Sequence, residues 1–372
     1  MPFISKPSEM LVNGNKTDII DFYVHNLELE YNIITIRFNK SLTNCNAMFY
    51  GLSNIINIKF INFDFSQVTT MTGMFYKCTN LKSIDFNNID VSAVIDMSDM
   101  FRECSNLISL NLSNFNTFSL LDMGSMFRDC NTLISLDLKN LITTSVVNIG
   151  SMFYGCNDLM SIDLSNFITL SVNNMDYMFD GCSELISLDL SIFDTSLVTR
   201  MNNMFNGCSK LLSLDLSNFN TSSVNNMNSM FYNCINLISL NLVNFIISSD
   251  CDITDMFKNC HSNLIFCFNS SSNNIRLKTE IEAYNFKNNC SNICFYKNKK
   301  IIFNEKICVF NCTDDYKYDY NNICLMQCPN GTHNISNNTC IKNDVFLNYD
   351  TNYYINYDTN HDTIYDTIYD TN

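Results

Sequence analysis

The dipeptide Met-Phe recurs every 26 residues, and this period constrains the fold more than any other feature of the sequence. Nine copies follow one another without insertion, beginning at residues 48, 74, 100, 126, 152, 178, 204, 230 and 256. A cysteine stands three residues after the phenylalanine in every copy except the first, where Leu52 takes that place. A fixed period of this size is typical of solenoids, in which each repeat packs only on its neighbours.

Each repeat is predicted to contain a short strand followed by a short helix. In the unit 211–236, Leu212, Leu214 and Leu216 alternate with polar residues, which is the period of a strand. After Ser223 the apolar residues are spaced by three and four positions, which would place them on one face of a helix. These residues are Val224, Met227, Met230, Phe231 and Cys234.

This alternation predicts an α/β solenoid with parallel strands on one side and short helices on the other. Strands spaced by ~4.8 Å and helices spaced by ~8–10 Å would curve the array, with the strands concave and the helices convex. We expect cap strands in 1–41, the solenoid in 42–268, a small disulfide-rich module in 269–341 and a low-complexity acidic tail in 342–372.

The blocks LDLSNF and SSVNNM, followed by Met-Phe and by the cysteine, resemble the leucine-rich repeat of BspA-like surface proteins, in the variant of mycoplasma lipoproteins. The resemblance covers about residues 42–264. It implies a leucine-rich-repeat solenoid at a cell surface, with adhesion or host-protein binding as its role.

Polar residues at two strand positions form the candidate binding surface. Stacked carboxylates about 5 Å apart would attract cations or a basic partner. The alternative is a solvated face that only keeps the sheet soluble. The candidate ligand-binding residues are Ser135, Asp137, Ser161, Asp163, Ser187, Asp189, Ser213 and Asp215.

The cysteines divide into two groups. Those of the repeat are expected to be buried free thiols, because helices 8–10 Å apart are too distant for disulfides. The others surround a stretch, CLMQCPNGTHNISNNTC, that resembles the modules of growth-factor-receptor and furin-like ectodomains, and such modules depend on disulfides. Zinc is the competing interpretation. The disulfide candidates are Cys267, Cys290, Cys294, Cys308, Cys312, Cys324, Cys328 and Cys340.

Composition narrows the function. Acidic residues outnumber basic ones by 37 to 22, which argues against nucleic acid as a partner. The four histidines are scattered and no nucleotide or protease motif is present, so we expect no enzyme, cofactor or metal site. No apolar stretch is long enough for a transmembrane segment, and no secretion signal is visible.

The predicted function is therefore non-enzymatic recognition of a protein or glycan partner through the concave face. Clustered Asn-x-Ser/Thr sequons beside the C-terminal cysteines favour a glycoprotein at the cell surface or outside the cell. The alternative is a cytoplasmic interaction scaffold of the same fold with reduced cysteines.

Overall fold

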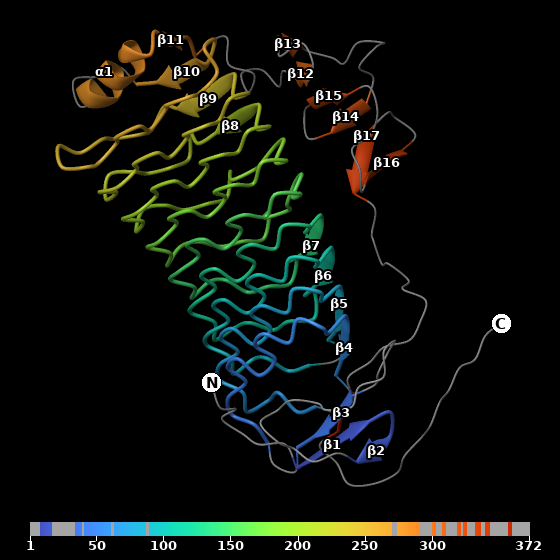
Figure 1. The fold of residues 1–372 in the computed structure, drawn as a ribbon. Coiled ribbons are helices and arrows are strands. Elements are labelled where there is room, and N and C mark those ends of the chain that lie inside the picture. Colours follow the sequence, from blue (N-terminus) through green and yellow to red (C-terminus); the bar gives the residue numbers. More distant parts are fainter. Residues whose placement is uncertain are drawn as a thin grey trace.

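The computed structural model describes residues 8–16, 34–38, 41–60, 63–86, 89–269 and 274–290, and the backbone of seven short strands between 300 and 358. Its main feature is a regular stack of coils, one for each 26-residue repeat (Figure 1). The strands of the stack are β4 (Asn57–Lys59), β5 (Ser83–Asp85), β6 (Ser109–Asn111), β7 (Ser135–Asp137), β8 (Ser213–Asp215), β9 (Ser239–Leu242) and β10 (Ile265–Phe268).

The strands pair in parallel with a register that follows the repeat. Ser109 lies opposite Ser135 in the β6–β7 pair, and Ser213 lies opposite Ser239 in the β8–β9 pair. A second set of parallel bridges runs along the other side of the coils, from the Asn44–Thr70 pair to the Asn226–Asp252 pair. The predicted parallel solenoid with a 26-residue coil is confirmed.

The predicted helices are wrong, because the Met-Phe segment of each coil consists of turns. The amide of Met74 bonds to Met71 O at 3.1 Å within the coil, while the amides of Met71 and Phe75 bond to Asp96 O and Met100 O of the next coil at 2.9 and 2.8 Å. Two residues four apart in each coil also adopt positive φ, as at Ser229 (54°) and Asn233 (60°). Positive φ interrupts a right-handed helix. The turns nevertheless point apolar side chains inward at the spacing that we took for a helix.

Turns in place of helices also remove the physical reason for a curved stack. Both sides of the stack are hydrogen-bonded from coil to coil, so both take the spacing of strands rather than that of packed helices. The ring centroids of Phe127 and Phe153, stacked on the turn side, are 5.9 Å apart. Those of Phe167 and Phe193, which follow the strand positions in their coils, are 6.1 Å apart. The coils accordingly lie as nearly parallel rungs (Figure 1), and we call the two sides the strand face and the turn face.

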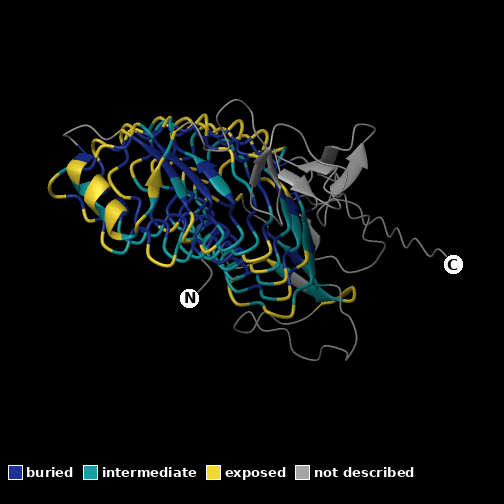
Figure 2. Ribbon diagram, turned by 90° about the horizontal axis from the view of Figure 1, so that it is seen from above, coloured by how far each residue is buried: buried dark blue, intermediate teal, exposed yellow. Residues whose placement is uncertain are grey.

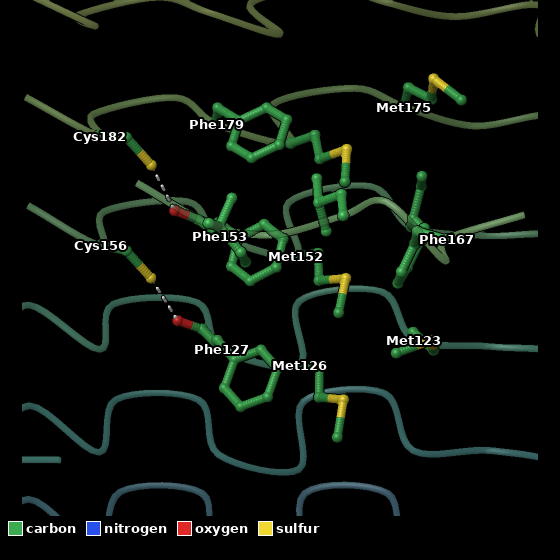
Figure 3. Packing of buried hydrophobic residues seen from close by; sticks show 14 of the residues in the cluster. Met123, Met126, Phe127, Met152, Phe153, Cys156, Phe167, Met175, Phe179 and Cys182 are labelled. Carbon is green, nitrogen blue, oxygen red and sulfur yellow. Dashed lines mark hydrogen bonds between the residues drawn. The ribbon is translucent and has the colours of Figure 1, made fainter. Parts of the chain in front are cut away.

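The core is a set of continuous columns of identical side chains. Phe127, Phe153 and Phe179 stack with nearly parallel rings beside Met126 and Met152, and all five are fully buried (Figure 3). The column runs from Phe49 to Phe257 through one ring per coil. Stacked aromatic pairs stabilise beyond their area of burial.

The repeat cysteines fill a column of their own beside these rings. The thiol of Cys156 donates a hydrogen bond to the carbonyl of Phe127 at 3.2 Å, and Cys182 does the same to Phe153 at 3.1 Å (Figure 3). A cysteine therefore combines a small apolar volume with a weak donor for a buried carbonyl. The prediction of buried free thiols is confirmed for the repeat cysteines up to Cys234, while Cys260 of the last coil is a half-buried free thiol. Coil spacing rather than helix spacing sets their separation.

Both ends of the stack are covered. At the start, β1 (Glu9–Val12), β2 (Asn15–Lys16) and β3 (Ile34–Arg37) form an antiparallel sheet, as expected for 34–37, and the Arg37 guanidinium pairs with Glu9 across it. Strand β18 (Asn356–Asp358), in the segment expected to be a low-complexity acidic tail, pairs in parallel with β3. Residues 17–33, within the range where cap strands were expected, are outside the described residues.

At the far end, α1 (Ile275–Ala283) closes the core. Its Leu277 and Ile281 are buried in the same apolar cluster as the coils, and β11 (Lys287–Asn288) adds to the edge of β10. This cap lies within the range that we assigned to the cysteine-rich module. The remaining strands form one six-stranded sheet: β12 (Lys300–Ile302), β13 (Ile307–Val309), β14 (Tyr318–Tyr320), β15 (Ile323–Leu325), β16 (Thr332–Ile335) and β17 (Thr339–Lys342).

The packing predicts the cost of truncating a column. Phe153→Ala should lower the free energy of unfolding by about 3–5 kcal/mol, because it removes a ring stacked on both sides. Urea denaturation followed by circular dichroism measures this. Leu170→Ala, at a side chain that is 57 % exposed, is the control and should change it by less than about 0.5 kcal/mol. Equal losses in the two variants would contradict the continuous core.

Candidate binding face

The predicted ligand-binding residues do lie together on the strand face, in two parallel rows. Ser135 and Asp137 stand opposite Ser109 and Asn111 of the preceding coil, and Asp215 stands opposite Asn241 of the following one. The coils that carry residues 161–163 and 187–189 have no assigned strand, yet they keep the stack through bonds such as Ile186 N to Met160 O at 3.1 Å. Each coil thus contributes one member to each row.

The two rows differ in accessibility. Ser161 is only 4 % exposed, and Ser135, Ser187 and Ser213 are half-buried. Among the carboxylates, Asp163 and Asp189 are exposed, while Asp137 and Asp215 are half-buried; we call these four the Asp row. A partner approaching this face would therefore contact the Asp row before the serines.

Each member of the Asp row also has a structural task. The Oδ1 atom of Asp163 accepts a hydrogen bond from Ser165 N at 3.0 Å, and Asp189 and Asp215 accept equivalent bonds from Ser191 N and Ser217 N at 2.9 Å. Such turns form wherever an Asx side chain reaches the amide two residues on. The turn uses one of the two carboxylate oxygens and does not require a charge, since Asn111 and Asn241 accept the same bond in their coils.

A depression on the strand face is shallow. It is lined by Leu138, Lys139, Asn166 and Asp163 of the Asp row, and it has no room for a water-sized group. A face of this shape suits an extended macromolecular surface better than a small ligand, which would need a concave pocket.

The turn face carries a second, more buried group of acidic residues. Asp176 is paired with Arg200 at 3.0 Å, and Asn206 Nδ2 donates to Asp180 Oδ1 at 3.1 Å. Burial raises the pKa of Asp180 to about 6. It also raises the pKa of Asp176, against the opposing charge of Arg200. Sequence reasoning missed this group, because the neighbouring coils hold no acidic residue at these positions: they carry Gly150 and Asn202 in place of Asp176, and Tyr154 and Asn206 in place of Asp180.

Sequence reasoning also missed an exposed apolar row between the two faces. Ile95, Leu121 and Val147 follow the buried residues Val94, Leu120 and Val146, and they are 37–45 % exposed. The signal in the sequence is an apolar residue directly after the buried one, at a position where the core needs no apolar side chain.

The cysteines can be assigned in part. Cys267 of β10 is disulfide-bonded to Cys290, so the residue that we considered as a partner for the C-terminal cysteines does pair with one of them. Burial raises the pKa of the Cys78 and Cys260 thiols to about 12, which keeps them protonated and unreactive. The other candidates lie outside the residues whose side chains are described: Cys294, Cys308, Cys312, Cys324, Cys328 and Cys340.

Within the described part of the chain, no three His, Cys, Asp or Glu side chains come close enough together to hold a metal ion. Over the same residues, no helix combines the length and the apolar character needed to cross a membrane.

Comparison with known proteins identifies the repeat. A family model described as "Mycoplasma protein of unknown function, DUF285" matches residues 43–167 and 151–268, which together make up more than half of the chain. No curated protein matches. A crystal structure titled as a TLR13–ssRNA13 complex aligns with 22 % identity and a TM-score of 0.32, over 62 % of this chain and 31 % of that chain. The alignment thus spans about a third of that protein's length.

The turn-face cluster gives a pH-dependent prediction. Between about pH 4 and pH 6 the folded chain holds the Asp180 proton more tightly than the unfolded chain, so stability falls as pH rises through this window. Asp180→Asn should therefore stabilise the protein by about 1–2 kcal/mol at pH 7 and leave it unchanged near pH 4. Urea denaturation at both pH values measures this. Asp163→Asn, at an exposed carboxylate, is the control, and a destabilised Asp180→Asn protein at pH 7 would contradict the assignment.

Proposed function

The chain belongs to the family of Mycoplasma proteins of unknown function, DUF285, and from this premise we propose that it is a non-enzymatic recognition protein. Its partner is a protein with a basic surface, which it contacts through the Asp row of the strand face. Adhesion or a related surface role would follow from such binding.

The Asp row is the observation that carries this proposal. It presents one carboxylate per coil at a spacing of about 4.8 Å, on a scaffold whose backbone is hydrogen-bonded on both sides. The turn that fixes each carboxylate needs only its Oδ1 atom and would accept Asn instead. Four consecutive coils nevertheless carry Asp, so the charge is an addition to what the fold requires.

The chemistry of the row favours protein over glycan as the partner. Closely spaced carboxylates attract Lys and Arg side chains, which proteins supply in rows and neutral glycans lack. Each contact at an exposed position is weak, so affinity has to come from several coils acting together. A rigid solenoid suits this, because the spacing of its carboxylates is fixed before binding.

The disulfide supports a location at the cell surface or outside the cell. Cys267–Cys290 joins the last solenoid strand to the segment after α1, and such bonds persist in oxidising compartments. The intracellular scaffold with reduced cysteines remains the competing hypothesis, and it differs in the state of the cysteines rather than in the binding face.

Neutralising the Asp row should abolish recognition without disturbing the fold. The triple variant Asp163→Asn/Asp189→Asn/Asp215→Asn keeps every turn acceptor and removes three charges. We expect it to bind a twelve-residue lysine-rich peptide on the order of tenfold more weakly than the natural chain, by calorimetry at physiological salt.

A matched control separates this from a general effect of net charge. Asp64→Asn/Asp194→Asn/Asp252→Asn removes three carboxylates that make the same kind of turn at other places in the coil. It should bind the peptide nearly as well as the natural chain. Equal weakening in both triple variants, or no peptide binding at all, would make the strand face a merely solvated surface, and binding of a neutral oligosaccharide instead would replace protein by glycan.

Thiol counting distinguishes the two compartments. In protein from its native source, denatured without reductant, the surface hypothesis predicts the ten free thiols of the described coils and protected cysteines beyond them. Alkylation followed by mass spectrometry gives the number. Modification of all 18 cysteines would instead support the reduced intracellular scaffold.

A further inference from the structure

Five large apolar side chains stand exposed along one edge of the coil stack, between the strand face and the turn face. We propose that this apolar edge docks a cationic amphipathic segment of a protein partner, at a site separate from the Asp row. Its members are 37–68 % exposed, and they are Ile95, Phe118, Leu121, Val147 and Leu170.

Backbone hydrogen bonds make the apolar edge continuous. Leu121 N donates to Ile95 O at 2.9 Å and Val147 N donates to Leu121 O at 2.8 Å, so these three residues stack in successive coils. Phe118 and Leu170 lie in the adjoining turns, two coils apart, and both are exposed. Exposed residues follow the outer loops of the coils (Figure 2). The result is a strip of exposed apolar surface across four coils, with successive coils ~4.8 Å apart.

The fold does not need apolar residues at these positions. In the row of Leu121 and Val147 the next coils carry Asn173 and Thr199, whose amides make the same bonds at 2.9 and 3.0 Å. At the turn tip, Ser196 stands where Leu170 stands one coil earlier. The five positions are therefore apolar by variation between coils and not by a need of the fold, although the turn tip of the following coil is also apolar at Leu197, which is 56 % exposed. A group of exposed apolar side chains on a soluble surface marks an interaction site.

Acidic residues border this strip. In the four edge segments 89–96, 115–122, 141–148 and 167–174 the charged residues are Asp90, Asp96 and Asp122, and none is basic. Hydrogen bonds from Ser92 hold the pKa of the Asp90 carboxyl below its usual value, so Asp90 is ionised at neutral pH. The complementary surface is an apolar stripe flanked by Lys or Arg, as on one face of a basic amphipathic helix.

The same charges argue against other occupants. A two-fold contact between copies of this chain would bring the acidic border against itself, and like charges in an interface are repulsive. An anionic membrane would be repelled in the same way. The chain's own residues 343–372 contain six Asp and no Lys or Arg, so they also lack the required charge.

The repeat itself supplies the variant that tests this proposal. Phe118→Ser/Leu121→Asn/Val147→Asn places at each position a residue type that other coils already carry there, such as Ser196, Asn173 and Asn225. Fluorescence anisotropy at physiological salt would measure binding of a fifteen-residue amphipathic peptide built only from Leu and Lys. We expect the variant to bind this peptide on the order of tenfold or more weakly than the natural chain, and a Leu/Glu peptide not to bind either protein.

Two controls make the result specific. Because a Leu/Lys peptide also carries the charge that the Asp row attracts, the apolar-edge substitutions are compared in the background of Asp163→Asn/Asp189→Asn/Asp215→Asn, which should itself still bind the peptide through the apolar edge. Failure of either surface is then distinguishable from failure of the other. An unchanged urea midpoint in the apolar-edge variant shows that the coils are intact.

Three outcomes would overturn the proposal. The first is equal affinity of the natural chain and the apolar-edge variant for the Leu/Lys peptide. The second is concentration-dependent dimerisation in light scattering that the variant loses, which would assign the edge to a second copy of the chain. The third is binding to anionic phosphatidylserine vesicles that the variant loses, which would assign it to lipid.

Discussion

Hydrogen bonding between successive coils, on both sides of the stack, is the constraint on which the rest of this structure depends. In the Met-Phe segment every second amide bonds forward to the next coil, as Met71 and Phe75 do, and the amides between them close turns within the coil. No donor is left over for a helix. Similar coil spacing on both faces follows, and with it the continuous columns of the core.

The columns explain why the repeat tolerates so little variation inside. The ring of Phe153 stacks on the equivalent Phe rings of the preceding and following coils. Its backbone carbonyl accepts a hydrogen bond from the thiol of Cys182 in the next coil. A larger or smaller residue in one coil would disturb two neighbours at once, because a close-packed interior does not absorb changes in volume. Outside the columns the constraint is weak, since only the backbone has to keep its register.

The surface is where the coils differ from one another, and those differences carry the functional hypotheses. At the strand face, Asn111 and Asn241 show that the turn needs an acceptor, whereas Asp163 and Asp189 add a charge. At the apolar edge, Asn173 shows that the backbone bond needs no apolar side chain, whereas Leu121 supplies one. In both places, comparing equivalent positions in different coils shows which property of the residue the fold requires.

The sequence by itself determined the period, the inward positions, the parallel strands and the burial of the repeat cysteines, because each depends on local alternation or on strict recurrence. It also brought the Asp row together, since residues 26 apart must stack in any solenoid. Only the tertiary structure decided that the Met-Phe segment is turns. A spacing of three and four is shared by a helix and by two successive turns with positive φ, as at Ser229 and Asn233. Hydrogen bonds between coils stabilise the turns rather than a helix. A single coil does not contain those bonds, so its sequence alone does not reveal the turns.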